Sequence, residues 1–190
     1  LINVIKNNKI YFCNHFHIPL QGGTDATLKR MYRKYDIAFY ENKINVIKDI
    51  FPGVNITTDI MVGFSGETEE DFNDTLAFVR KIGYGDIHVF PYSRRPKTKA
   101  YHFPDIINDI TKHYRVNELL RLNEELALKY REGFVGKVVE VIVETVKGNL
   151  AYGHSSEYLE ISFNGNVSVN DLVKVKITKA GYPVSEGVIV

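Results

Sequence analysis

The chain has 190 residues, of which 44% are hydrophobic and 25% are charged, and its formal net charge at pH 7 is +1. This composition is ordinary for a soluble globular protein, and so small a net charge provides no overall basic field for nucleic acid. No apolar run approaches the roughly 20 residues that a membrane-spanning helix needs, so we expect no membrane partner.

Cysteine usage is the most restrictive feature of the composition. Cys13 is the single cysteine, so the chain by itself has neither an internal disulfide nor a cysteine cluster for zinc or iron–sulfur. We expect Cys13 to be a small buried residue on an apolar strand, and a cytoplasmic location for a chain that needs no oxidation to fold. Because the sequence starts at Leu1 and not at Met, we interpret it as part of a longer protein.

The first 133 residues alternate strand-like and helix-like segments. Apolar and β-branched runs predict strands at 10–18, 55–62 and 86–90. Caps and amphipathic spacing predict helices between and after them: around Leu28 and Met31 with a cap at Thr24 or Asp25, over 40–51, from a capping box of Thr68 and Asp71 to Gly83, and over 111–132. Such alternation predicts an α/β fold with a parallel sheet covered by helices.

The pattern changes at about Gly133, where helices give way to short strands. Strands are predicted at 138–144, 158–163 and 172–177, with turns at Gly148, Gly153, Asn164-Gly165 and Ala180-Gly181. Short strands at this spacing indicate a small closed β-barrel similar to an oligonucleotide-binding fold. We therefore predict two domains, residues 1–133 and residues 134–190.

Three loops follow the three predicted parallel strands, at 21–25, 63–67 and 92–98. The carboxyl edge of a parallel sheet usually carries the ligand site, so these loops are the candidates. The acidic start of the helix after the second loop is explained by the helix dipole, except for Glu67, which precedes the cap. The basic third loop is either a solvated surface or, since Tyr92 and Tyr101 flank it, a contact for phosphates and bases.

Two histidines, His15 and His17, are spaced to share one face of the first strand. Zinc usually takes three or four protein ligands, so packing or hydrogen bonding is the more common role for such a pair, and we predict no metal ligand. The lack of convergent His and Asp ligands at the strand ends also disfavours a metal-dependent hydrolase. No general acid or base stands out, so no catalytic residue is predicted.

Three blocks of sequence resemble the radical-SAM methylthiotransferases. They are residues 15–25, beginning His15-Phe16-His17-Ile18-Pro19-Leu20-Gln21, residues 57–72, and residues 88–100. The likeness covers nearly the whole chain, because the part from Phe134 resembles the TRAM domain that ends these enzymes. Two site-loop residues depart from the family pattern, which usually has Ser at the place of Gly22 and Pro at the place of Ser65.

The resemblance implies that residues 1–133 are the C-terminal half of a partial (β/α)6 radical-SAM barrel of the TIM type, followed by an all-β, OB-like TRAM barrel. It also implies S-adenosyl-L-methionine (SAM) and 4Fe–4S clusters as cofactors, with the CxxxCxxC cluster motif in a missing N-terminal half of the same polypeptide. The resemblance further implies that the full-length protein is an enzyme and that the fragment alone is inactive. An open half-barrel would also expose the predicted strand near Tyr11, which favours a fragment over a complete protein.

Site residues are carried over from the family as hypotheses. The resemblance assigns SAM binding to seven residues: Gln21, Arg33, Asp59, Gly63, Phe90, Tyr92 and Ser93. The basic loop and the TRAM-like barrel would bind RNA through Arg94, Arg95, Lys97, Lys147, Tyr158, Lys174 and Lys176. The barrel has five lysines and no arginine against six acidic residues, so RNA binding requires lysines, Lys179 included, gathered on one face. A packing module without RNA contact is the alternative.

The predicted substrate is the anticodon stem–loop of tRNA. The segments from Cys13 to His17 and from His88 to Arg95 look most like the branch that methylthiolates threonylcarbamoyladenosine next to the anticodon. Two further branches remain as alternatives, one acting on isopentenyladenosine in tRNA and one on an aspartate of a ribosomal protein. A non-catalytic RNA-binding protein is the alternative from another class.

Overall fold

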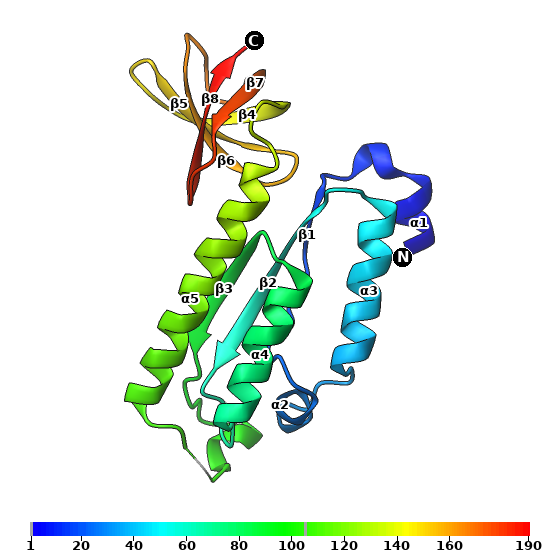
Figure 1. Ribbon diagram of the computed structural model, residues 1–190, viewed down its shortest axis with the longest axis vertical. Helices are drawn as coiled ribbons and strands as arrows, with labels where there is room; N and C mark the ends of the chain where they lie inside the picture. Colours follow the sequence, from blue (N-terminus) through cyan, green and yellow to red (C-terminus); the bar gives the residue numbers. More distant parts are fainter. Residues whose placement is uncertain (1, 105) are drawn as a thin grey trace. The chain divides into compact units, whose positions relative to one another are not determined.

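A computed structural model of the chain describes residues 2–104 and 106–190 (Figure 1). It contains two compact units. One unit is formed by His17–Asp49 and Ile56–Leu126, and it carries most of the parallel sheet. The other is formed by the segments up to Phe16, Ile50–Asn55 and Ala127–Val190, and it carries the barrel. The division into domains 1–133 and 134–190 stays a prediction.

The sheet has three strands in the order β1 (His15–His17), β2 (Asn55–Val62) and β3 (Asp86–Pro91). Strands β2 and β3 are parallel. Just beyond β1, a parallel bridge joins Gln21 to Ile60. The predicted α/β arrangement with a parallel sheet is confirmed.

Helices α2 (Asp25–Arg30), α3 (Ile37–Ile50), α4 (Glu69–Ile82) and α5 (Asp109–Glu132) occur between and after the strands, in the chain order that the sequence predicted (Figure 1). Their ends follow local chemistry. Thr24 caps α2 by accepting a hydrogen bond from the Thr27 N–H, and Thr68 and Asp71 form the predicted capping box of α4. Gly83 ends α4 in the left-handed region, at φ +68°.

The two faces of the sheet differ in exposure. On β2 the side chains of Ile56, Ile60 and Val62 are almost fully buried, whereas Asp59 and Met61 on the alternate face are only half-buried. Because side chains of a strand alternate between faces, β2 has one face packed into the core and one polar, partly open face. Helix α5 is tied to the sheet by a hydrogen bond from Asn123 Nδ2 to Asp86 Oδ1, 2.9 Å.

The start of the chain differs from the prediction. After α1 (Ile2–Asn7), residues Lys9–Tyr11 form a short 3-10 helix, and β1 begins only at His15. Ile10 is 87% exposed and Tyr11 79% exposed, and Cys13 is exposed as well. The expected strand at 10–12, the strand edge near Tyr11 and the buried Cys13 are therefore wrong. Three apolar residues are too few to show a periodicity, and Asn8 accepts the backbone hydrogen bond that turns the chain at Tyr11.

The second unit contains a closed five-stranded barrel in the order β4-β5-β6-β8-β7. The strands are β4 (Val138–Lys147), β5 (Leu150–Ser155), β6 (Glu160–Asn164), β7 (Leu172–Lys179) and β8 (Val184–Ile189). All neighbours are antiparallel except β6 and β8. The interior is filled by alternate residues of β4, β5, β6 and β7, together with Leu159 just before β6: Val141, Val143, Ala151, Leu159, Ile161, Phe163, Val175 and Ile177. The expected small closed barrel is confirmed.

The sequence did not predict two of the barrel strands, β5 and β8. The sequence places a turn at Gly153, but this residue lies inside β5, opposite Val143. A Cβ at Gly153 would overlap the carbonyl oxygen of Ile142, so glycine is needed there for the close approach of two strands. Among residues 2–104 and 106–190, no helix is both long and apolar enough to cross a membrane.

Candidate functional site

Two adjoining cavities lie at the carboxyl edge of the parallel sheet. One, of about 250 Å³, is lined by Gln21, Arg33 and Met61, and the other, of about 240 Å³, by Met61 together with Phe90, Tyr92 and Ser93. Met61, Thr98 and Ala100 belong to both. The fold thus brings five of the seven expected SAM residues around Met61. Asp59 and Gly63 are not among the lining residues of either cavity.

Gln21 is held in an uncommon backbone conformation at this edge. Its φ is +72°, in the left-handed region that side chains other than glycine seldom adopt. The strain is maintained by two backbone hydrogen bonds: the Gln21 N–H donates to Asp59 O (2.9 Å), and the Met61 N–H donates to Gln21 O (3.0 Å). Conformations of this kind persist where the surroundings fix them, which is common at binding sites.

Arg33 follows α2 and is exposed. Within the described part of the chain, its guanidinium has no ion-pair partner. A guanidinium presents a planar fork of donors that matches a carboxylate in two parallel hydrogen bonds. Arg33 is therefore free to bind an anionic group in the cavity that it shares with Gln21.

A buried ion pair between Glu67 and Arg115 of α5 fixes the loop from Gly63 to Glu67. Glu67 Oε2 accepts hydrogen bonds from the Gly63 N–H (2.6 Å) and from Arg115 Nη1 of α5 (2.7 Å). The two charged side chains are 3% and 4% exposed. Burial raises the pKa of Glu67, and the Gly63 N–H and Arg115 oppose the shift. Glu67 is thus a structural anchor of the loop, which accounts for the acid that helix capping left unexplained.

Gly63 itself stands against α5. Its φ is +73°, and a Cβ there would overlap Cγ of Lys112. In this structure glycine is required at position 63 because the Lys112 side chain of α5 lies so close to it.

A second carboxylate, Asp71, joins the first loop to the start of α4. Its oxygens accept hydrogen bonds from Thr24 Oγ1 (3.0 Å), Arg30 Nη2 (2.8 Å) and the Thr68 N–H (3.0 Å). Burial alone would raise the pKa of Asp71, but these hydrogen bonds together hold the pKa below its ordinary value. The ionised Asp71 thus ties the first candidate loop and α2 to the start of α4.

The basic loop contains residues with different environments. Arg94 is engaged within the loop, since its Nη2 donates to Phe103 O (2.6 Å) and its guanidinium lies over the Tyr101 ring. Arg95 and Lys97 are exposed, and Lys97 has a φ of +69°. Arg95 and Lys97 are therefore the members of this loop whose charges are directed to solvent.

The barrel lysines named in the sequence do not all gather at one place. Lys174 and Lys176 lie on the outer face of β7, where Lys174 is paired in register with Glu140 of β4. Lys147 lies at the other end of β4, seven residues away, which corresponds to roughly 23 Å along a strand. Lys179 is held by Glu186 at 2.8 Å. The structure thus separates Lys147 from the pair on β7.

Tyr158 is 57% exposed and has a φ of +61°. Two histidines stack on its ring, His15 (ring centroids 4.8 Å apart, planes at 10°) and His154 (4.6 Å, 22°). A nucleobase that stacks on Tyr158 would therefore have to compete with these two imidazoles.

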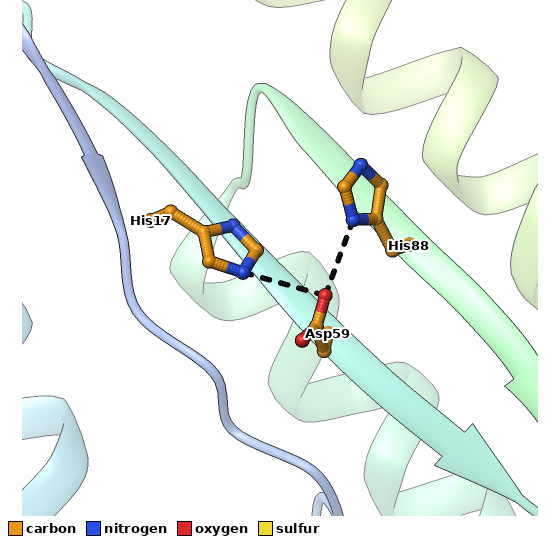
Figure 2. A group of neighbouring side chains, drawn as sticks. All are labelled: His17, Asp59 and His88. Carbon is orange, nitrogen blue, oxygen red and sulfur yellow. Dashed lines mark hydrogen bonds and ion pairs between the residues drawn. The ribbon is translucent and has the colours of Figure 1, made fainter.

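Sequence reasoning missed a cluster on the open face of the sheet. His15 stacks on Tyr158. His17 instead meets Asp59 of β2 and His88 of β3, and the three side chains point toward one another (Figure 2). Asp59 and His88 are partners in the β2–β3 register. No sequence signal could have found the cluster, because the register of parallel strands joined by a helix is not visible in spacing.

A larger cavity, of about 1070 Å³, was also missed. Its cationic lining comes from α2 and the turn after it: Lys29, Arg30, Arg33 and Lys34. The sequence did contain a sign of this cationic surface, because these four residues form a basic run in which Tyr32 and Tyr35 are interspersed.

Comparison with known proteins identifies the class. The profile of the Radical SAM superfamily matches residues 1–79. The threonylcarbamoyladenosine tRNA methylthiotransferase MtaB of Bacillus subtilis (strain 168) is 40% identical over 180 residues, which are 92% of this chain and 40% of the relative.

Two further relatives are tRNA-2-methylthio-N(6)-dimethylallyladenosine synthases. The one from Pelotomaculum thermopropionicum is 40% identical over 88% of this chain and 38% of its own length, and the one from Lachnoclostridium phytofermentans is 39% identical over 94% and 40%. The chain belongs to the radical-SAM tRNA methylthiotransferase family, and it spans about 40% of the length of these relatives.

Proposed function

We propose that this chain is the C-terminal half of a partial (β/α)6 radical-SAM barrel followed by a TRAM barrel, in a cytoplasmic enzyme that methylthiolates threonylcarbamoyladenosine in the anticodon stem–loop of tRNA. The observation that carries the proposal is the cavity at the carboxyl edge of the parallel sheet, where Gln21 and Arg33 converge. The open face of β2 supports the barrel, because in a closed barrel that face lines the interior.

SAM fits the residues that are present. Arg33 would bind its carboxylate, Gln21 its polar groups, and Phe90, Tyr92 and Ser93 its adenine through aromatic and backbone contacts. Asp59 of β2 and Gly63, which follows β2, would line the side of this strand that faces SAM. SAM and a reduced iron–sulfur cluster supply the radical chemistry, while the protein orients the cofactor and limits the access of water.

The iron–sulfur cluster itself does not fit these residues. Such clusters are held by several cysteine thiolates, and this chain has one cysteine, which is exposed. The proposal therefore requires cysteines from the remainder of a longer polypeptide, and these 190 residues would be inactive alone.

RNA contact is proposed for two surfaces. The exposed Arg95 and Lys97 lie beside the cofactor cavity, where a modified base would have to enter, and Arg94 would support their loop. On the barrel, Lys174 and Lys176 form the main contact, with Lys147 and Tyr158 at separate positions. Phosphate neutralisation by these few lysines predicts modest, salt-dependent binding.

The choice of substrate is tested in the organism that carries the gene. Deletion of the gene should abolish the methylthio derivative of threonylcarbamoyladenosine in bulk tRNA and leave methylthio-dimethylallyladenosine at its normal level. Mass spectrometry of tRNA nucleosides measures both. Loss of the dimethylallyl product alone would transfer the assignment to the other branch, and unchanged levels of both would remove tRNA methylthiolation altogether.

Arg33→Ala in the full-length enzyme should weaken SAM binding by about tenfold or more, because a charge-assisted hydrogen bond contributes roughly 1.5–3 kcal/mol. Calorimetric titration with SAM measures the affinity. Arg121→Ala is the matched control, since Arg121 is 77% exposed on α5 and pairs only with its helix neighbour Glu118 among the described contacts. Equal SAM affinity in both variants would remove Arg33 from the site.

A further inference from the structure

The cluster of His17, Asp59 and His88 provides three potential metal ligands from three adjacent strands (Figure 2). Asp59 Oδ1 lies 3.4 Å from His17 Nε2 and 3.2 Å from His88 Nδ1, and all three donor atoms fall within 4.8 Å of one another. The arrangement follows from the fold, because Asp59 and His88 are register partners and project from the same face.

The separations match those across a metal ion. In tetrahedral zinc sites the bonds to nitrogen and oxygen are about 2.0–2.1 Å, so two ligand atoms stand about 3.3–3.4 Å apart. The two distances to Asp59 Oδ1 are close to this value, and the longer one exceeds the usual range of a hydrogen bond. The third separation, between the ligand nitrogens of His17 and His88, is at most 4.8 Å. Because the His88 side chain is 72% exposed, it can rotate to bring its nitrogen to the distance that a zinc ion requires.

The hydrogen-bond partner of the second ring nitrogen of His17 is also of the kind found behind metal-binding histidines. His17 Nδ1 lies 3.0 Å from Thr57 Oγ1. When Nδ1 carries the proton and donates it to Thr57, Nε2 presents its lone pair to Asp59, and two lone pairs face each other unless a cation lies between them. Metal-binding histidines almost always donate their second nitrogen to such a partner.

Within residues 2–104 and 106–190, no lysine or arginine lies within ion-pair distance of the Asp59 carboxylate. The two imidazoles are its ion-pair partners there, and a divalent ion would place a positive charge next to this carboxylate.

We propose that His17, Asp59 and His88 bind a divalent transition-metal ion of the zinc class. Two imidazoles and one carboxylate are a ligand set for such ions, and three protein ligands leave a fourth position for water or another oxygen ligand. The site lies two residues along the strands from the pair Met61 and Phe90, or roughly 7 Å, and thus close to the cofactor cavities. The ion would link β1, β2 and β3 on their open face.

The test is a calorimetric titration of the tag-free 190-residue chain with ZnCl2, with stoichiometry confirmed by equilibrium dialysis and metal analysis. Wild type should bind one zinc ion per chain. Thr57→Val removes the hydrogen-bond partner of a ligand, His17, and should weaken zinc binding by roughly 10- to 100-fold. His88→Gln removes a ligand itself and should weaken zinc binding by more than that. His113→Gln, an exposed histidine on α5, is the control and should leave the affinity unchanged.

Circular dichroism of each variant in EDTA establishes that the fold is retained, which is expected for His88→Gln because the side chain is exposed. The proposal is wrong if wild type binds no zinc in one-to-one stoichiometry, or if His88→Gln and His113→Gln bind it equally. The assay contains neither SAM nor tRNA, so its failure would leave the proposed function untouched, and failure of the nucleoside analysis would leave this site untouched.

Discussion

Arg115→Ala should lower the free energy of unfolding of this chain by about 3–5 kcal/mol, because it leaves the buried Glu67 carboxylate without its partner. Arg115 Nη1 donates to both Glu67 Oε2 (2.7 Å) and Glu67 O (3.2 Å), and its guanidinium lies over the Phe72 ring. Its Nη2 also pairs with Glu69 Oε2 (3.2 Å). The substitution therefore removes two ion pairs, a hydrogen bond to the loop backbone and a packing contact at once. Urea denaturation followed by circular dichroism measures the loss.

Arg80→Ala is the matched control. Arg80 also forms an ion pair with a glutamate, Glu125, but the two side chains are 56% and 58% exposed. Exposed pairs contribute about 0–1 kcal/mol, so the control should change stability little. Similar losses in both variants would mean that the Glu67–Arg115 pair does not anchor the loop.

The stability difference between wild type and Arg115→Ala should depend on pH in a defined direction. Burial already raises the pKa of Glu67 above its ordinary value of 4.5, and loss of Arg115 would raise the folded-state pKa further. A carboxyl whose pKa is raised on folding favours the folded state most at low pH and loses that contribution as pH rises through the folded-state pKa. The defect should therefore be smaller at about pH 5 than at pH 8.

Local signals in the sequence predicted much of the fold. The strand at 55–62, the capping box of Thr68 and Asp71, and the helix end at Gly83 all appear as expected, because each depends on residues within a few positions of one another. The apolar residues at 10–12 and the glycine at 153 were misinterpreted. Their environment is set by distant residues, so the same local pattern is compatible with more than one structure.

The candidate site was predictable in position but not in its internal contacts. The rule that ligands bind at the carboxyl edge of parallel strands points to the edge at which two cavities lie, and the binding of a ligand there stays a prediction. The pairing of Glu67 with Arg115 joins residues 48 positions apart, and the meeting of His17, Asp59 and His88 depends on strand register. Contacts of this kind arise from tertiary packing, and a single sequence contains no trace of them.

Gly153 of the barrel stands where two strands approach most closely. An ideal Cβ on this residue would overlap the carbonyl oxygen of Ile142, and it would lie 2.8 Å from the Ile142 carbonyl carbon and 2.9 Å from Val141 Cγ1. The first two atoms belong to the backbone of β4, which cannot rotate away as a side chain does. The added methyl must therefore separate β4 from β5, next to the irregularity in their pairing between Val143 and Thr145.

Gly153→Ala should consequently destabilise the barrel by about 3 kcal/mol or more, at or above the upper end of the usual range for overpacking, since a backbone has to move. Urea denaturation measures the effect, and failure to obtain soluble protein counts as the same outcome. Gly148→Ala makes the identical chemical change in open space, where the cost is limited to the strain of a φ of +64°, about 1 kcal/mol. Because the two glycines lie in the same hairpin, a smaller loss for Gly153→Ala than for Gly148→Ala would show that β4 and β5 do not pack as closely as the structure places them.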